Sequence, residues 1–118
     1  MEVSRLIRDT KLSREVKAIH DNTCQICGYR LELSTETTYA EGHHLQPLGQ
    51  DHSGPDVKEN IICVCPNCHV KLDFRAFRIT PGMLRLKDGH TVAQRFIDYH
   101  NNQVDQRLEA AADSANRR

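Results

Sequence analysis

The stretch NIICVCPNCHVKLD, residues 60–73, decides how this chain folds. Its segment IICV (61–64) is short, apolar and rich in β-branched residues, which predicts a buried strand. Pro66 follows closely, and proline suits the first turn of a helix. The chain is therefore expected to pass from a buried strand into a helix through the turn Cys-Pro-Asn-Cys.

Four of the five cysteines form two C-x-x-C pairs, Cys24 with Cys27 and Cys65 with Cys68. Each short turn presents two thiolates in one half of a tetrahedral site, which is typical of zinc. Four thiolates leave no open position, so this zinc is expected to be structural. Redox chemistry or chance burial are the alternatives for such pairs. Cys63 is one residue from Cys65, which suits such a turn poorly, and we expect a buried free thiol.

The residues before position 60 predict one helix and two strands. Thr10 or Ser13 is suited to cap a helix whose apolar stripe is Leu12, Val16 and Ile19, ending near residues 21–23. YRLEL (29–33) alternates polar and apolar residues as a strand does, and TYAEGHHL (38–45) is a second strand candidate. Residues 46–60, rich in proline, glycine and acidic or amide residues, read as a loop.

The residues after position 75 predict a hairpin and a helix. FRIT (77–80) and MLRLK (83–87) flank Pro81-Gly82, a pattern that favours a small hairpin. From Thr91 onward, apolar residues recur at helical spacing, namely Val92, Phe96, Tyr99, Val104 and Leu108. The predicted fold class is α+β, in a single domain over residues 1–118.

Length and composition set limits on the function. A chain of 118 residues that is 38% apolar and lacks Trp has a small core, for which a bound metal is a common additional constraint. Its sixteen basic and sixteen acidic residues balance, which argues against a histone-like protein but leaves room for a local basic face. We expect no membrane segment and no signal peptide, and hence a cytoplasmic protein with reduced thiols.

The seven histidines need separate explanations once zinc has four cysteines. An isolated histidine is most often a hydrogen-bonded or solvated residue, the interpretation that we keep for His20, His90 and His100. His52 lies in the loop, where a solvated position is favoured over a substrate contact. His43 and His44 are adjacent at the end of a strand, and His69 directly follows Cys68.

The order HHLQPLG (43–49), Asn60 and His69 in CPNCH resembles the motif of HNH endonucleases. The resemblance implies a ββα-metal (His-Me finger) core over about residues 14–75, flanked by the N-terminal helix and, over about 77–110, by the hairpin and helix. The two C-x-x-C pairs resemble the zinc-stapled type of this family. IRDTKLSREVKAIHDNTCQICG (7–28) and GPDVKENIICVCPNCHVKLD (54–73) further resemble HNH domains found after SRA (YDG) modified-base-binding domains in modification-dependent restriction proteins.

By this resemblance, His44 is the general base, and His43 and His69 bind one catalytic divalent metal, Mg²⁺, Mn²⁺, Co²⁺ or Ni²⁺. Asn60 would hold the strand that carries the base. Position 43 is more often acidic in the family, and neighbouring strand residues point to opposite faces, so a bend at Gly42 is expected to turn both histidines inward. Asp73, one helical turn after His69, is a third ligand, a partner of a ligand or a solvated residue.

The function implied is metal-dependent hydrolysis of DNA, double-stranded, in restriction of foreign or modified DNA, with a linked domain to read any modified base. Lys71 with Arg75, and Arg14 with Lys17, are phosphate contacts or solvated charges. A non-catalytic zinc-stapled nucleic-acid-binding module, or an inactive HNH relic, is the alternative. A purely structural zinc domain for protein interaction leaves the histidines at 43, 44 and 69 unexplained.

Overall fold

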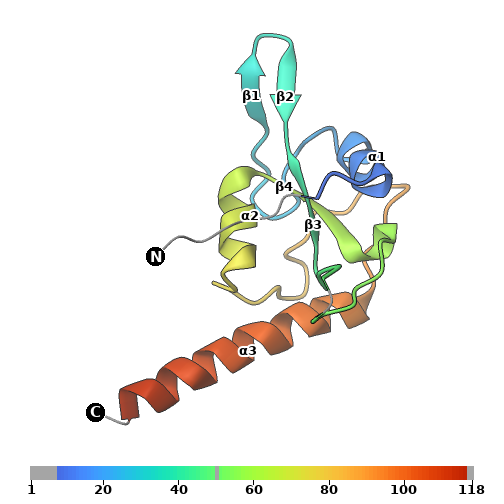
Figure 1. Cartoon of the computed structure of the whole chain (residues 1–118). Helices are drawn as coiled ribbons and strands as arrows, with labels where there is room; N and C mark the ends of the chain where they lie inside the picture. Colours follow the sequence, from blue (N-terminus) through green and yellow to red (C-terminus); the bar gives the residue numbers. More distant parts are fainter. Residues whose placement is uncertain (1–7, 50, 117–118) are drawn as a thin grey trace.

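A computed structural model describes residues 8–49 and 51–116 of the chain. Its elements follow one another as three helices, four strands and one 3₁₀ turn (Figure 1): α1 (Lys11–Ile19), β1 (Leu31–Ser34), β2 (Thr37–Tyr39), β3 (Glu41–His44), the turn Lys58–Asn60, β4 (Ile61–Val64), α2 (Pro66–Asp73) and α3 (Gln94–Asn116). The strands form two separate antiparallel pairs, β1 with β2 and β3 with β4. The α+β class expected from the sequence is confirmed.

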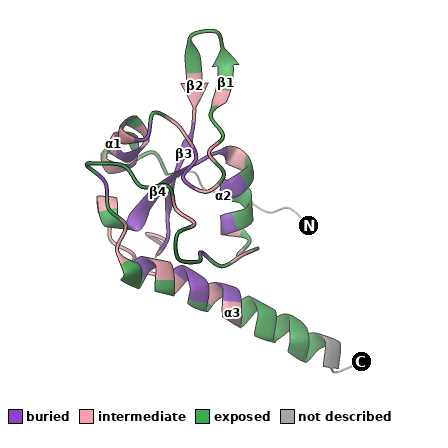
Figure 2. Ribbon diagram, turned by 180° about the vertical axis from the view of Figure 1, so that it is seen from behind, coloured by how far each residue is buried: buried purple, intermediate pink, exposed green. Residues whose placement is uncertain are grey.

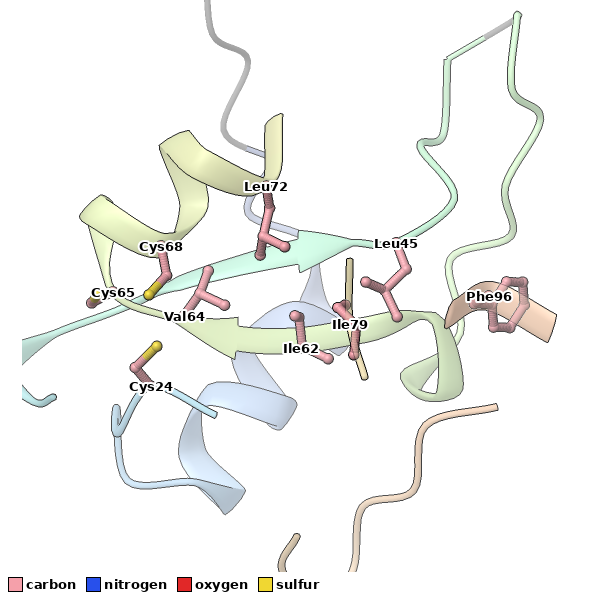
Figure 3. Packing of buried hydrophobic residues seen from close by; sticks show 9 residues of the cluster. All are labelled: Cys24, Leu45, Ile62, Val64, Cys65, Cys68, Leu72, Ile79 and Phe96. Carbon is pink, nitrogen blue, oxygen red and sulfur yellow. The ribbon is translucent and has the colours of Figure 1, made fainter. Parts of the chain in front are cut away.

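The pair β3–β4 is the centre of the fold, and every residue of both strands is buried. Its register runs from Glu41 opposite Val64 to His44 opposite Ile61. Figure 3 shows the two strands between α2 on one side and α1 on the other. Two strands and a helix that follows the second strand form the predicted ββα unit.

Alternation along β4 divides the core into two clusters. Ile62 and Val64 face α2 and pack with Leu72, Phe96 and other residues of the larger cluster (Figure 3). The intervening residues of β4 pack with Val16 of α1. This division follows from the strand geometry, in which successive side chains point to opposite faces.

Helix α1 begins where the sequence indicated. Thr10 is its N-cap, and the Thr10 Oγ1 accepts a hydrogen bond from the backbone N–H of Ser13 at 3.1 Å. Ser13 therefore lies inside the helix rather than capping it. Gly42 of β3 allows this helix to lie close to the sheet, because a Cβ at position 42 would lie 2.7 Å from the Cβ of Ser13. A larger residue at position 42 would push α1 away.

The predicted single strand over residues 38–45 is in fact two strands. Residues 37–39 pair with β1, and residues 41–44 pair with β4, so Ala40 marks the change of partner. The β1–β2 hairpin extends away from the rest of the molecule (Figure 1), and β1 is largely exposed.

The predicted hairpin around Pro81-Gly82 is wrong. Between α2 and α3 the described chain forms no strand, only an isolated bridge between Lys87 and His90. The backbone groups that would pair across a hairpin bind elsewhere. Asn101 of α3 bonds both the N–H and the C=O of Ile79, and Gln25 bonds the N–H and the C=O of Arg85. Side chains and backbone from distant elements thus replace the partner strand.

Helix α3 has two different halves. Its first part is anchored by buried residues, Phe96, His100, Asn101 and Val104. The turns that follow Val104 are exposed and extend past the core (Figure 2). The helix continues to Asn116, beyond the expected end near residue 110. Within the described ranges, no helix has the combination of length and apolar composition that crossing a bilayer requires.

Candidate functional site

The four cysteines of the two C-x-x-C pairs come together as predicted. Their sulfur atoms all lie within 4.8 Å of one another, and the sulfurs of Cys27 and Cys65 are 3.7 Å apart. In a tetrahedral zinc site with Zn–S bonds of about 2.3 Å, sulfurs lie about 3.8 Å apart. The group is therefore a four-thiolate site that can bind zinc, at the end of the strand pair where β4 leads into α2 (Figure 3).

The fifth cysteine, Cys63, lies outside this group. It is fully buried in β4, and burial raises the pKa of its thiol to about 12. The prediction of a buried free thiol is confirmed. Burial also raises the pKa of Cys68, together with the negative charge of the neighbouring Cys24 sulfur. A cation at the four sulfurs would offset this effect by displacing their protons.

Gln25 joins the first C-x-x-C turn to the rest of the fold. The backbone N–H of Gln25 donates to the carbonyl of Cys63 at 2.8 Å, and its Oε1 accepts from the N–H of Cys63 at 2.9 Å. Its Nε2 donates to the carbonyl of Arg85. The sequence analysis missed this residue, since only its position between the two cysteines hinted at a role.

A second group lies at the other end of α2 from the sulfur cluster. His43 of β3 and His69 and Asp73 of α2 place one ligand atom each within 4.8 Å of the others. Asp73 Oδ1 is 3.5 Å from His43 Nδ1 and 3.6 Å from His69 Nε2. Of the three roles open for Asp73, the geometry favours that of a third ligand. Two imidazoles and a carboxylate fit a divalent transition metal and leave positions for water and substrate.

Glu41 fixes the orientation of His69. Its Oε1 accepts a hydrogen bond from His69 Nδ1 at 2.8 Å, and its Oε2 accepts one from the Tyr39 hydroxyl at 2.8 Å. Because Nδ1 carries the proton, the lone pair of His69 is on Nε2, which faces Asp73. A carboxylate behind a metal-binding histidine is a common arrangement. The sequence analysis missed Glu41, although residues 41 and 43 share a strand face by simple alternation.

His43 is suited to the neutral form that binds a metal. It is 7% exposed, and its pKa lies well below 6.5, chiefly because burial disfavours the charged imidazole and also because His69 and His100 are close. A neutral imidazole keeps the lone pair that a cation requires.

His44 points to the opposite face of β3 from His43. Its Nε2 lies 2.8 Å from Asp56 Oδ1, and the same oxygen accepts a hydrogen bond from the Thr10 hydroxyl at 3.1 Å. The strand pairing continues through Gly42 without a bulge, so the expected bend at this glycine is wrong. Gly42 instead provides room for α1. Both histidines nevertheless border one hollow of about 70 Å³, together with His69 and Asp73.

Asn60 holds the ends of the loop between β3 and β4. Its Oδ1 accepts from the N–H of Gln46 at 2.8 Å, and its Nδ2 donates to the carbonyls of Gln46 and Pro55, each at 2.9 Å. The side chain is fully buried. These bonds suit a residue that positions the histidine strand, which is the role that we predicted for it.

The remaining histidines make contacts outside the two clusters. His20 Nε2 lies 2.8 Å from His90 Nδ1, and His100 Nε2 donates to the carbonyl of Phe77. His52 Nδ1 lies 2.5 Å from the hydroxyl of Tyr99, which ties the loop to α3.

Comparisons with known proteins agree with this geometry. Residues 24–75 match the HNH endonuclease family. The Type IV methyl-directed restriction enzyme EcoKMcrA of Escherichia coli (strain K12) is 31% identical over 80 residues, which cover 63% of this chain and 28% of the relative. The solved structure of the Modification dependent TagI restriction endonuclease matches with a TM-score of 0.75 and 36% identity, over 81% of this chain and 38% of that one. The chain thus spans well under half of either relative.

Proposed function

Because this chain belongs to the HNH endonuclease family through residues 24–75, we propose that it hydrolyses phosphodiester bonds in double-stranded DNA with the help of one divalent metal ion. The observation that carries the proposal is the group His43, His69 and Asp73, placed at one hollow with His44. A relic would have no need to retain three ligand atoms beside a fourth, separately oriented histidine.

The ligand group would hold Mg²⁺, Mn²⁺, Co²⁺ or Ni²⁺. Such an ion supplies positive charge to a phosphate on which negative charge develops in the transition state. Glu41 keeps the Nε2 of His69 directed at the site through its bond to Nδ1. The donor set of two nitrogens and one oxygen favours the transition metals over Mg²⁺.

His44 would take a proton from the attacking water. Its Nε2 donates to Asp56, so Nδ1 is the nitrogen that accepts the proton. The Asp56 carboxylate holds the ring and stabilises the imidazolium that results, and Thr10 holds Asp56 in turn. Asn60 acts at a distance by fixing the loop that connects His44 to Asp56. The products would be 5′-phosphate and 3′-hydroxyl ends, as the family resemblance implies.

The biological role that we propose is restriction of foreign or modified DNA in the cytoplasm. The two relatives named above are a methyl-directed restriction enzyme and a modification-dependent restriction endonuclease. Because the chain corresponds to a minor part of each, recognition of a modified base would fall to a linked domain.

The test is cleavage of a supercoiled plasmid by the zinc-loaded protein in a series of divalent metals. H44A should lower the rate by about 10²–10⁴-fold, since a general base contributes that much. H52A is the matched control, because His52 belongs to neither cluster, and it should cut at close to the rate of the unaltered protein. Cleavage by H44A at the unaltered rate would exclude His44 as the base. DNA binding without any cleavage would favour the non-catalytic module.

A further inference from the structure

A continuous path leads away from the ligand group toward α3. The hollow at His43, His44, His69 and Asp73 shares His43 and Asp73 with a neighbouring hollow of about 50 Å³. That second hollow shares Asp73, Arg75 and Gln103 with a wider one of about 570 Å³. A substrate bound at the ligand group can therefore extend over the end of α2 and along α3.

The lining of this path suits a phosphodiester backbone. Asp73 belongs to the ligand group, and the other charged residues that line the second and third hollows are Arg75 and Arg107. Gln103 and Gln106 add amide groups on α3. Guanidinium and amide N–H groups are common donors to phosphate oxygens, and such contacts position a duplex without reading its sequence.

Arg75 occupies a backbone position where glycine is usual. Its φ is +54°, directly after the C-cap of α2. The N–H of Ala76 bonds the carbonyl of Lys71, and the N–H of Arg75 bonds that of Leu72, which together form a Schellman motif. The left-handed conformation at this position disfavours a side chain. An arginine held there against its preference, beside a candidate metal group, indicates a functional side chain.

Arg107 connects this turn to α3. Its Nε donates to the carbonyl of Arg75 at 2.8 Å. This bond uses one of the five N–H donors of the guanidinium, so the others remain for a ligand. The positions of the two arginines are thereby coupled. Lys71, expected from the sequence to share a helix face with Arg75, lies on the helix proper and outside the path.

We propose that Arg75 binds the phosphate next to the one held at the ligand group, and that Gln103, Gln106 and Arg107 bind the phosphates that follow. This proposal rests on the proposed function and adds a substrate track on α3, outside residues 24–75. The occupant is the sugar–phosphate backbone of one strand of the DNA duplex.

Two measurements separate the track from catalysis. The first is binding of a short random-sequence duplex to the zinc-loaded protein without added divalent cation, over a range of salt concentrations. The second is cleavage with Mn²⁺, resolved into kcat and KM. The variants are R75A, R75G and R107A, with R30A as the control of equal charge, because Arg30 is paired with Asp21 and does not line the path.

R75A and R107A should each reduce the slope of log K against log salt by about 0.9, the change for one phosphate contact. R75A should also lower kcat by at least about 10-fold, because Arg75 borders the reacting phosphate. R107A should mainly raise KM. R75G should melt at a temperature equal to or above that of the unaltered protein and still lose binding, which a merely structural arginine would not do. R30A should behave as the unaltered protein.

The failures are distinguishable. If the unaltered protein cuts DNA while R75A and R107A match R30A in slope, kcat and KM, the track is wrong and the nuclease stands. If nothing is cut but the slopes fall as expected, the track stands and the nuclease is wrong. If the unaltered protein does not bind the duplex even at low salt, the track is wrong.

Discussion

The two candidate metal sites share helix α2 and differ in almost every other respect. Cys65 and Cys68 lie at its beginning, and His69 and Asp73 on its first and last turns. The sulfur site has four donors of one kind, the number that closes a tetrahedral shell. The His43 site has three donors of two kinds and borders a hollow. The first is built to hold a helix and the second to use it.

This division explains why a short chain can support a site with open positions. A cation with free positions stabilises a fold weakly, because water and substrate provide part of its coordination. The cysteine site fixes α2 against β4 independently, so that His69 and Asp73 are in place before any catalytic metal binds. The following predictions test that independence.

The largest effect should come from the sulfur site. C68A should leave the protein unfolded or molten, because structural zinc contributes about 10–16 kcal/mol to small zinc domains. C63A is the matched control, a buried thiol outside the group, and should cost only about 1 kcal/mol. Zinc content and thermal melting measure both. Equal melting of C68A and C63A, with zinc retained, would contradict a structural zinc site.

Asp73 should affect only the second site. D73N should weaken binding of Mn²⁺ by at least about 100-fold, because it removes a charged ligand, and should leave zinc content unchanged. K71A, an exposed change on the same helix, should bind Mn²⁺ normally. Calorimetric titration of Mn²⁺ into the zinc-loaded proteins decides the point. Loss of zinc in D73N would mean that the two sites are not independent.

Glu41 should have a smaller effect of the same kind. E41Q keeps the shape of the side chain but removes the charge behind His69, and should weaken Mn²⁺ binding by about 10–100-fold. Y39F removes only the hydrogen bond to Glu41 Oε2 and should have less effect. Unchanged Mn²⁺ affinity in E41Q would show that the carboxylate does not orient the ligand.

The contrast between the sites also explains what could be read from the sequence. Cysteine pairs at short spacing state their own geometry, so Cys24, Cys27, Cys65 and Cys68 were recognisable from spacing alone. The strand and helix around them followed from the apolar run 61–64 and Pro66. Asp73 and Glu41 were not decidable in this way, because their roles depend on which strand face meets α2. That choice is made by packing, when Ile62 and Val64 turn toward Leu72.

The irregular segment between α2 and α3 was beyond sequence patterns for a related reason. Its apolar residues alternate well enough to suggest two strands. Its backbone groups are bonded instead by Asn101 and Gln25, which are remote in sequence from Ile79 and Arg85. Asp56 escaped notice similarly, since its position in a loop gives no hint that it faces His44.

The smallest effect concerns a histidine pair that belongs to neither site. His69 faces a carboxylate, whereas His20 faces His90, whose Nε2 donates to the carbonyl of Lys58. His90 Nδ1 is then an acceptor, so His20 Nε2 donates to it. Burial and the proximity of His90 and Lys87 lower the pKa of His20 to about 4 from 6.5. The fold therefore favours neutral His20.

Stability should depend on pH accordingly. As the pH falls through 6.5, the unfolded chain takes up a proton at His20 that the folded chain refuses until about pH 4. The contribution of this residue is complete above 6.5 and is lost progressively between 6.5 and 4. H20Q retains a donor toward His90 and cannot be protonated, so its urea midpoint should fall less steeply across this range. The zinc site is the same in both proteins, so acid release of zinc affects them alike, and parallel curves would assign the acid sensitivity to the cysteines instead.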